Sequence, residues 1–588
     1  RGLGDVYKRQ VKGLEIKGNF TYMFNTQHNL NRQVNTEYSQ YPGEVQTLST
    51  GSRFQDKLYE KTMMHNYYQA NVYATYAHTW NEKHNFKAMA GFNWETKYLK
   101  DVSATGYNLL SETLMDLNLV GQGADGNERM EVGGGQNEYA LMGFFGRLNY
   151  DYKGKYLVEV SGRYDGTSRF KRGHRWGFFP SAAAGWVISN ESFFEPLTNV
   201  IQYLKVRGTW GQVGNSQISG RRFAYLATVT DSSSTSYTFG KNMDQNYGTT
   251  AIDEYAVDVT WEVADKTDIG VDMRLLNNKL NLQFDYFKES REGIYLRRSS
   301  IPSYVGMINN PYGNIGKVEN KGIEMSVSYA NSWRDWSLSV MGNYSFNRNK
   351  VLEDDSTVAY PWQKTIGNKV DQRFGLIALG LFESPEEIAA APVQVGDTRP
   401  GDIRYKDING DGKIDEYDKV PIGWGSVPEI VYGFGFSVGW KGLSLSAMFQ
   451  GAAHVDEILS GEGVLPFAQG SSRGNLLSNI TDRWTEENPR QNAFYPRLSI
   501  GNINMNYEES TWWLKDTDYL RLKNIELSYR LPDHWMKRIH LDNARIFIQG
   551  VNLLTFSSFK IWDVELGDGR GARYPNIASV SLGVNFNF

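Results

Sequence analysis

The sequence has no cysteine, so no disulfide bridge can stabilise it. This absence fits a bacterial protein that lies outside the cytoplasm and needs no disulfides. The sequence also lacks any apolar run close to the ~20 residues that a membrane-spanning helix requires, and its mean hydropathy is -0.50. An excess of one charge is missing as well. The net charge is -4 and the pI is about 6.2, which argues against a nucleic-acid partner.

Aromatic residues and glycine are abundant instead. Aromatics make up 14% of the chain, with 36 tyrosines, and there are 59 glycines. The chain of 588 residues is too long for one ordinary globular core, yet its composition marks no domain boundary. A β-barrel in a membrane resolves these observations, because only every second residue of its strands must be apolar.

The last residues of the chain alternate between apolar and polar side chains. Serine, glycine or asparagine separates the apolar positions, which share one face of the predicted strand: Val580, Leu582, Val584, Phe586 and Phe588. A C-terminal strand that ends on phenylalanine is the signature by which outer-membrane barrels are recognised for insertion. We therefore predict an insertion signal at Val584, Phe586 and Phe588, and a location in the outer membrane of a Gram-negative bacterium, in contact with its lipid.

The same two-residue period recurs from residue 11 onward. One set of positions is aliphatic in mid-strand and aromatic towards the strand ends, as lipid and its interfaces require. The other set is small and polar, as an aqueous or plug-filled lumen requires. The clearest segments are 14–25, 280–286 and 336–346.

Connections between the predicted strands are of two kinds. Tight turns are predicted at Lys153-Gly154, Asn277-Asn278, Asn331 to Arg334, and Lys441-Gly442. Long polar loops are predicted at about 28–63, 100–136, 214–258, 353–426 and 456–515. Tight turns at one rim and long loops at the other are typical of outer-membrane barrels.

Together these patterns predict an all-β fold, a transmembrane antiparallel up-and-down β-barrel of about 16 strands with long extracellular loops. An even number of strands lets the first strand rise from the periplasm and the C-terminal end return to it. Leu520 and Leu522 are out of phase with Ile525 and Leu527, which predicts a bulge near Lys523-Asn524.

The first ten residues differ from the rest. Residues 1–10 resemble translated adapter sequence, and we interpret them as a non-native leader outside the fold. Residues 11–588 then form the barrel segment. Because the chain begins with arginine and shows no signal peptide, we expect it to be truncated at this end.

One long loop contains an acidic motif that runs from Asp407 to Asp418. It matches an EF-hand calcium loop at positions 1, 3, 5, 6 and 9, and Gly412 permits its sharp turn. The Lys413 carbonyl completes the predicted oxygen ligands, whose side chains are those of Asp407, Asn409, Asp411, Asp415 and Asp418. An EF-hand has a bidentate glutamate where Asp418 stands, so binding would be weaker. The alternative is a run of Asx turns. No helical pattern flanks the motif, so a bound calcium would be a structural clip.

Signals for catalysis are poor, and we expect no enzyme activity. Gly470 to Gly474 matches G-x-S-x-G, but it lacks the preceding strand and following helix of a nucleophile elbow. The 8 histidines are scattered without the spacing of a metal site, and His174 lies in a basic loop. Four loop aromatics could stack on sugar rings, although a place in the aromatic girdle or packing within the loops is the favoured interpretation: Tyr360, Trp362, Trp512 and Trp513.

Seven motifs, in order along the chain, resemble the barrel of SusC/RagA-type TonB-dependent transporters of Bacteroidetes. The resemblance extends from about residue 11 to the end, and the shared order of the motifs makes it specific. The motifs are FGRLNYDYKGKY at 145–156, RYDGTSRF at 163–170, RWGFFPS at 175–181, GQVGN at 211–215, NKGIE at 320–324, PGDI at 400–403 before the acidic loop, and YLRLKN at 519–524.

This resemblance implies a barrel of about 22 strands with a plug in its lumen. It also implies uptake of oligosaccharides or peptides, a SusD-like surface lipoprotein that closes the outer face as a lid, and energy coupling through the TonB complex. About six strands, the plug, the TonB-contacting segment and the signal peptide would then precede the present sequence. No residue here is therefore assigned to energy coupling or to substrate binding.

Two alternatives remain open. A passive porin of about 16 strands would need no plug, since that number can close a barrel. The numerous long loops and the calcium-like motif favour the transporter over it. A membrane-barrel hydrolase would require a serine and a histidine that converge at the wall, and the scattered histidines do not indicate this.

We predict that deleting Asn587 and Phe588 abolishes assembly into the outer membrane, because the insertion signal ends on Phe588. Heat-modifiable migration of the protein in outer-membrane fractions measures assembly. Wild-type amounts of heat-modifiable barrel from the deletion variant would contradict the predicted signal.

Overall fold

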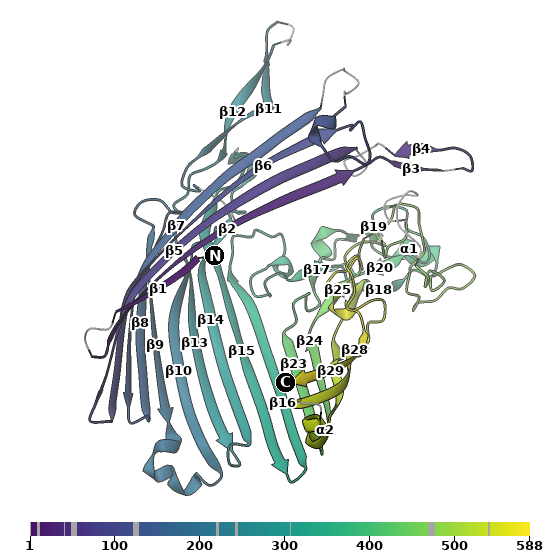
Figure 1. Ribbon diagram of the computed structural model, residues 1–588. Helices are drawn as coiled ribbons and strands as arrows, with labels where there is room; N and C mark the ends of the chain where they lie inside the picture. Colours follow the sequence, from purple (N-terminus) through teal and green to yellow (C-terminus); the bar gives the residue numbers. More distant parts are fainter. Residues whose placement is uncertain are drawn as a thin grey trace.

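A single large antiparallel sheet dominates the computed structural model (Figure 1). The structure describes residues 2–8, 12–39, 41–48, 56–121, 129–218, 223–241, 245–305, 307–461, 463–467, 477–501, 503–538 and 541–587. Within these residues the sheet has 17 strands, and leaving out the first one gives 16, the predicted number. The edge strands β1 and β29 pair in this sheet with β2 and β28 alone among the described residues. The sheet therefore curls without closing, as an incomplete barrel.

The strands of this sheet follow one another in chain order, as an up-and-down topology requires. They are β1 (Gly2–Lys8), β2 (Leu14–Gln33), β5 (Lys57–Trp80), β6 (His84–Tyr107), β7 (Met130–Tyr152), β8 (Tyr156–Thr167), β9 (Trp176–Val187), β10 (Ile201–Asn215), β13 (Glu262–Leu275), β14 (Leu280–Arg297), β15 (Tyr312–Trp333), β16 (Trp336–Glu353), β23 (Ile430–Trp440), β24 (Leu443–Ala453), β27 (Tyr519–Arg530), β28 (Asn543–Ser557) and β29 (Ser579–Asn587).

The connections divide between the two rims as predicted. At one rim β23 and β24 are joined by Lys441 and Gly442 alone, both with positive φ, the geometry that suits the twist of a hairpin. Lys153 in the β7–β8 turn and Asn277 in the β13–β14 turn also have positive φ. The predicted turn before β16 lies slightly later than expected, at Arg334-Asp335. We call this the tight-turn rim and the opposite one the outer rim.

The strands β2, β5, β6 and β7 are much longer than the sequence pattern predicted. They have 20, 24, 24 and 23 residues, whereas a tilted strand needs only about 9–11 residues to cross a bilayer. Figure 1 shows them extending far to the upper right of the view, away from the tight-turn rim. The predicted loops at about 28–63 and 100–136 are therefore wrong in extent. In the structure these two connections span only residues 34–56 and 108–129. Their polar flanks are strand that continues outside the apolar band.

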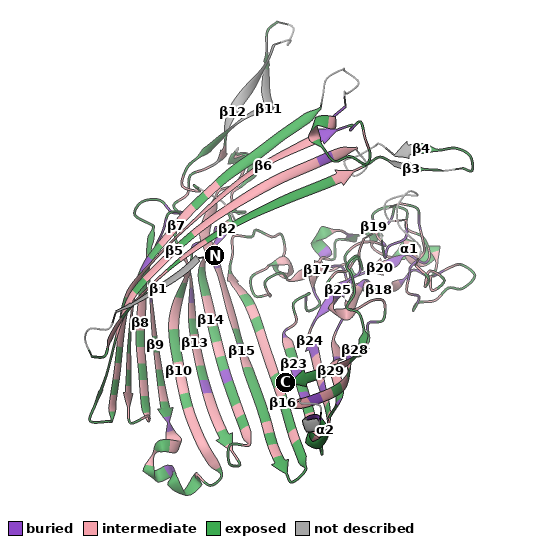
Figure 2. Ribbon diagram, in the orientation of Figure 1, coloured by how far each residue is buried: buried purple, intermediate pink, exposed green. Residues whose placement is uncertain are grey.

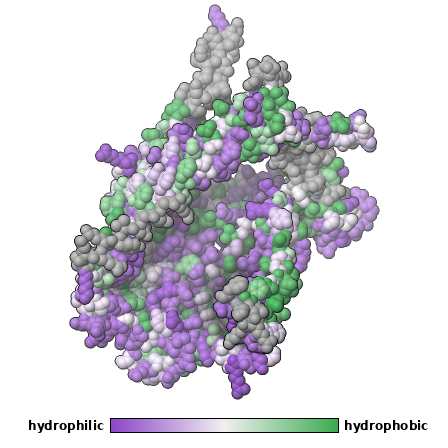
Figure 3. Space-filling view, in the orientation of Figure 1, coloured by the Kyte–Doolittle hydropathy of each residue, from purple (hydrophilic) through white to green (hydrophobic). Residues whose placement is uncertain are grey.

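The two faces of the sheet differ as the alternation predicted. Outward side chains such as Phe284, Val340 and Phe436 are apolar and exposed, and exposed and less exposed positions alternate along β15 and β16 in Figure 2. Figure 3 shows hydrophobic residues gathered over the C-terminal strands, whereas hydrophilic residues line much of the hollow behind. The sheet thus has a lipid-compatible outside and a polar inside.

The register confirms the predicted bulge. Phe449 of β24 pairs with Leu522 and Met448 pairs with Asn524, so Lys523 has no partner across the ladder. The same shift occurs against β28. The bulge returns the apolar side chains on both sides of it to the outward face.

The leader predicted for residues 1–10 contains β1, which pairs with β2 from Gly2↔Tyr22 to Lys8↔Ile16 and so extends the sheet. Its non-native origin stays a prediction.

The remaining elements lie in the connections, and all of them except β11 and β12 are short. Among the described residues no helix is both long and apolar enough to cross a membrane. These strands are β3 (Thr36–Tyr38), β4 (Gln46–Leu48), β11 (Thr228–Phe239), β12 (Gln245–Glu254), β17 (Arg373–Gly375), β18 (Ala378–Leu381), β19 (Val393–Gln394), β20 (Ile403–Tyr405), β21 (Lys413–Ile414), β22 (Val420–Ile422), β25 (Asp456–Ile458) and β26 (Leu514–Asp516), and the helices are α1 (Pro385–Ala390) and α2 (Asp533–Arg538). Single 3-10 turns span Leu117–Leu119, Ile188–Asn190, Ser192–Leu197, Ser303–Val305, Pro361–Gln363, Glu416–Asp418 and Val564–Leu566.

Candidate functional site

The two longest outer loops fold together into one packed unit, which we call the loop body (residues 354–429 and 454–518). Short strand pairs hold it, among them β17 with β22 and β18 with β20. Its interior contains two clusters of buried apolar side chains, an arrangement that the polar composition of the loops conceals. The first is Ile422, Ile458, Leu459, Val464, Leu465, Tyr495 and Trp513, joined by Phe559 from the last outer loop, and the second is Leu376, Leu381, Ile403, Tyr405, Ile414, Trp484 and Ala493.

A buried carboxylate joins the two halves of the loop body. Asp402 is 1% exposed. It accepts two hydrogen bonds from the Arg497 guanidinium, both at 2.9 Å, and one from the Arg399 backbone N–H. The side-chain amides of Asn504 and Asn506 donate to it at 3.2 and 2.8 Å. A buried ion pair is tolerated only with hydrogen bonds of this number and geometry, so this cluster fixes how the two loops meet.

A second cluster of buried charges, around Asp456, also joins the two loops of the loop body. Arg373 of β17 donates to the Asp456 carboxylate at 2.7 Å and to Glu457 at 2.9 Å. Asp456 also accepts the backbone N–H groups of Trp424 and Gly425. The start of β25 is thereby fixed against the end of the preceding loop.

Three basic side chains surround the carboxylate of Glu429, which lies just before β23 at the outer rim. Arg348 donates to both of its oxygens at 2.9 and 2.7 Å, Lys369 lies 3.1 Å away, and the His454 ring nitrogen is also 3.1 Å away. Burial alone would raise the pKa of Glu429, but the hydrogen bonds from Arg348, Lys369 and His454 outweigh it and lower that pKa to about 2. The carboxylate is therefore ionised at neutral and mildly acid pH.

The last outer loop is held to the sheet by Arg521, which lies in the YLRLKN motif. Its guanidinium contacts Asp563 and donates to Glu565 at 2.5 Å, and its Nε donates to Thr555 at 3.0 Å. Lys523, the bulge residue, reaches the same Glu565 at 3.1 Å. Arg521 and Lys523, two residues apart in one strand, thus bind a single loop.

The inner face of the sheet is a charged wall. Arg207 of β10 lies 2.8 Å from Asp268 and 3.4 Å from Asp272, both on β13, and contacts Asp285 of β14. Gly270 lies beneath the guanidinium, and a Cβ there would be 2.3 Å from the Asp285 carboxylate and 2.5 Å from Arg207 Cζ. A side chain at this position would therefore displace the carboxylate or the guanidinium from the cluster.

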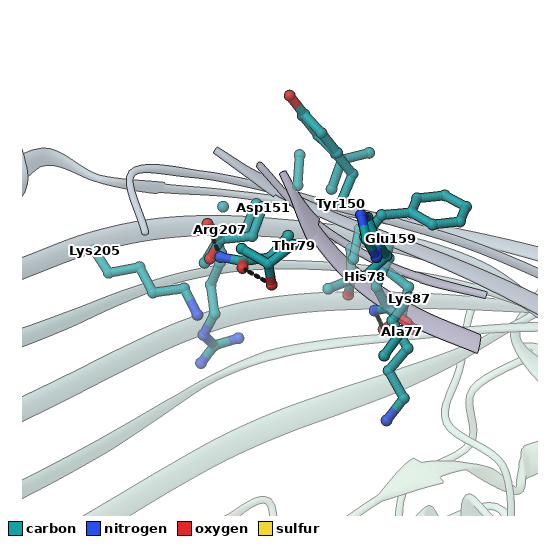
Figure 4. A pocket seen from close by; sticks show the side chains of 18 of the residues that line it. Ala77, His78, Thr79, Lys87, Tyr150, Asp151, Glu159, Lys205 and Arg207 are labelled. Atoms are coloured by element: carbon teal, nitrogen blue, oxygen red, sulfur yellow. Dashed lines mark hydrogen bonds between the residues drawn. The ribbon is translucent and has the colours of Figure 1, made fainter. Parts of the chain in front are cut away.

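One cavity on this face, of about 750 Å³, lies between β2 and β10 towards the tight-turn rim. Figure 4 shows Lys87 and Arg207 extending to the same side of the sheet. Its charged and amide lining is Lys12, Asn85, Lys87, Asn149, Asp151, Glu159, Lys205 and Arg207. The lining also includes apolar side chains such as Phe86 and Leu157, so the cavity offers hydrogen bonds to polar solutes beside apolar surface.

The acidic loop is ordered by its own side chains. Asp407 accepts the N–H groups of Gly410 and Gly412 at 2.7 and 2.9 Å, one on each carboxylate oxygen. The Asn409 amide donates to Asp411 at 3.0 Å, which brings the predicted ligands at positions 3 and 5 together. These contacts are Asx-type turns, the alternative that the sequence left open.

The carboxylate of Asp418, the last residue of the motif, lies inside the loop. Asp418 is fully buried and accepts the N–H groups of Ile408 and Asp415 at 2.7 and 3.0 Å. Lys413, whose carbonyl is a predicted ligand, donates its N–H to Asp411 at 2.9 Å. Among the residues that the structure describes, no group of three or more histidine or acidic side chains is arranged to hold a metal ion. Calcium binding stays a prediction.

The comparison with known proteins now decides the family. The family model described as TonB dependent receptor-like, beta-barrel matches residues 4–553. The chain belongs to this family. It is 27% identical to the TonB-dependent receptor P3 of Formosa agariphila over 534 residues, which cover 86% of the chain and 51% of that relative. It is also 27% identical to the TonB-dependent receptor SusC of Bacteroides thetaiotaomicron, over 76% of the chain and 44% of SusC.

Solved structures agree on the fold. The RagAB peptide transporter matches with a TM-score of 0.74 at 20% identity, covering 99% of this chain and 61% of that one. The chain spans about half the length of the curated relatives that it matches. The chain is thus the barrel of a TonB-dependent receptor and lies in the outer membrane, as predicted, and its similarity to SusC and to the RagAB transporter confirms the resemblance.

The other predicted positions fare differently. In β29, Val584 and Phe586 face outward and are 45% and 53% exposed, whereas Phe588 lies outside the described residues, so the insertion signal stays a prediction. The G-x-S-x-G segment 470–474 also lies outside them. His174 is exposed in the β8–β9 loop.

The loop aromatics pack within the loops. Trp513 is 1% exposed and donates its indole N–H to the Asn506 carbonyl. Tyr360 and Trp362 stack on each other at 4.6 Å. This is the packing role favoured from the sequence.

We predict that Asp402→Ala loosens the loop body, because it leaves the largely buried Arg497 guanidinium without its carboxylate partner. Loss of one partner of a buried pair costs roughly 3–5 kcal/mol. Limited proteolysis of the full-length protein in detergent should therefore cut the loop body markedly faster.

The matched control is Asp397→Ala. Asp397 lies five residues before Asp402 and forms an exposed ion pair with Arg399. Exposed pairs contribute about 0–1 kcal/mol, so cleavage should stay at the wild-type rate. Equal cleavage of the two variants would contradict a central role for Asp402.

Proposed function

We propose that the complete protein is an active transporter of the outer membrane that imports oligosaccharides or peptides. In this proposal a SusD-like surface lipoprotein acts as its lid, and the TonB complex supplies energy through the N-terminal part. The observation that carries the proposal is the family match along residues 4–553, in a chain about half as long as its relatives. The similarity to SusC and to the RagAB peptide transporter supports the two substrate classes.

The outer rim supports the lid. A partner that opens and closes repeatedly needs a surface that does not deform, and the loop body has its own apolar core and the buried Asp402–Arg497 pair. Flexible loops would lose conformational entropy at each docking event. The loop body avoids most of that cost, because its contacts are already formed.

The inner wall supports passage of a polar solute. Lys87, Lys205 and Arg207 alternate with carboxylates and amides on the lumen face. Sugars and peptides can both exchange hydrogen bonds with these side chains. The wall alone does not distinguish the two substrate classes, since both carry donors and acceptors.

A passive porin is the second candidate. It is supported by the 16 strands that remain when β1 is left out of the sheet. The transporter is favoured because the sheet edges β1 and β29 do not pair with each other in the part of the chain that the structure describes, and because the family match is to TonB-dependent receptors.

The two candidates differ in their need for energy. We predict that cells carrying the full-length protein take up labelled oligosaccharides or peptides, and that an uncoupler or loss of TonB reduces this uptake at least tenfold. Diffusion of a small solute through resident porins serves as the control and should not change. Uptake that persists after uncoupling would identify a passive porin.

We also propose that loop 407–418 binds calcium as a structural clip. The sequence match and the proximity of Asn409 to Asp411 support it, and carboxylate, amide and carbonyl oxygens suit the ion. Asp418 fits less well, because it already accepts backbone N–H groups.

Calorimetry tests the clip. We predict that the full-length protein releases or absorbs heat with millimolar calcium, and that Asp411→Ala removes this heat and speeds proteolysis of the loop. Glu416→Ala is the matched control, since Glu416 is exposed in the same loop at a position without a predicted ligand role. A wild-type protein without calcium-dependent heat would refute the clip.

A further inference from the structure

On the outward face of β14, β15 and β16, the positions of aromatic and charged side chains indicate where the hydrocarbon layer of the membrane begins and ends. Near the tight-turn rim, Trp336 of β16 lies against Trp440 of β23, with ring centroids 5.7 Å apart, as expected for an interfacial aromatic belt. The next outward positions of β16 are uncharged: Leu338, Val340, Gly342, Tyr344 and Phe346. The first outward charge after them is Arg348.

The distance from Trp336 to Arg348 matches the hydrocarbon layer. Arg348 follows Trp336 by twelve residues in one strand. At about 3.3 Å per residue and a tilt of roughly 35–45°, twelve residues rise about 30 Å along the membrane normal. The hydrocarbon core is about 30 Å thick. Arg348 therefore lies at the level of the headgroups of the outer leaflet.

Two lysines on the neighbouring strands lie at the same level. Lys288 of β14 pairs with Lys321 of β15, and Lys321 pairs with Arg348 of β16. One step below, Tyr286, Ile323 and Phe346 are also in register and face the lipid. We call Lys288, Lys321 and Arg348 the cation row. Their side chains are 49%, 57% and 48% exposed.

Three like charges in direct register are unfavourable by themselves, because adjacent strands are only about 4.8 Å apart. On the next outward level, Glu319 contacts Lys288 at 2.8 Å and Lys321 at 3.4 Å. A fourth cation, Lys350, stands directly beside Glu319 in the ladder. On β14, β15 and β16 these two outward levels thus carry four cations and one carboxylate, Glu319.

The remaining partner of the row does not remove the excess charge. Glu429 binds Arg348 through its Nε and one terminal nitrogen. The same carboxylate is shared with Lys369 and lies against His454. Among the described residues the other terminal nitrogen of Arg348 makes no hydrogen bond. The side chains of Lys288 and Lys321 stay half exposed beside their contacts with Glu319.

We propose that the cation row binds the phosphate of an anionic lipid headgroup in the outer leaflet, with a phosphorylated glycolipid as its occupant. Lysine and arginine are the usual partners of phosphate, and arginine adds directional donors. The apolar side chains directly below the row face the acyl chains of the same lipid. The site rests on the outer-membrane location of the family and is independent of the transported substrate.

Lipid binding to the purified full-length protein tests the site. The variant carries Lys288→Gln, Lys321→Gln and Arg348→Gln, and the probes are phosphorylated lipid A and the same lipid after enzymatic dephosphorylation. Each basic residue near an anionic surface contributes about a factor of five to association. The triple variant should therefore bind phosphorylated lipid A on the order of 100-fold more weakly. Native mass spectrometry in detergent counts the bound lipid.

The matched control removes the same charge from the inner wall, as Lys87→Gln, Arg147→Gln and Lys205→Gln. It should bind lipid A like the wild type. Equal loss in both variants, or equal binding of dephosphorylated lipid, would overturn the proposal. Competition by excess inorganic phosphate that abolishes lipid binding would identify a phosphate-ion site instead, and would overturn the lipid assignment. If the triple variant fails to assemble, the single Lys321→Gln variant should lose about fivefold, and unchanged binding would be decisive against the row.

Discussion

Inside hydrocarbon an unpaired backbone N–H or C=O finds no water, so a chain that crosses as strands must pair each of them along its length. Most of this structure depends on that constraint. The pairing of successive strands fixes the register, and a slip of one residue would carry the apolar set into the lumen. The Arg207 cluster with Asp268 and Asp285 forms inside, and Trp336 meets Trp440 outside, only because β10 to β23 keep one register.

The outer loops obey a different requirement. They lie in water, where backbone groups are easily solvated, and they achieve order through a core of their own. Leu376, Tyr405 and Trp513 are almost completely buried there. The buried pair of Asp402 with Arg497 makes this packing specific to one arrangement of the loops, because a misplaced loop would leave a charge without partners. The barrel is thus specified by backbone pairing and the loop body by side chains.

Much of the fold could be predicted from the sequence, because period-two alternation reports directly which face of a strand meets lipid. The Lys441-Gly442 hairpin and the bulge at Lys523 follow from local phase alone. The outer parts of β5 and β6 could not be found this way, since neither face is apolar beyond the membrane. Asp402 was present in a recognised motif, yet its role was invisible, because its partners Arg497 and Asn506 are about a hundred residues away. Contacts between distant loops leave no periodic trace in the sequence.

The two-residue connection at Lys441-Gly442 has a consequence for how such proteins can change over time. An insertion there would shift the ladder by a residue and reverse every side chain of the next strand. An insertion into the connection 354–429 adds only a slowly growing cost of loop closure. Sequence growth is therefore confined to one rim of the molecule. The face turned to the environment is free to diversify, whereas the face turned to the cell keeps its length.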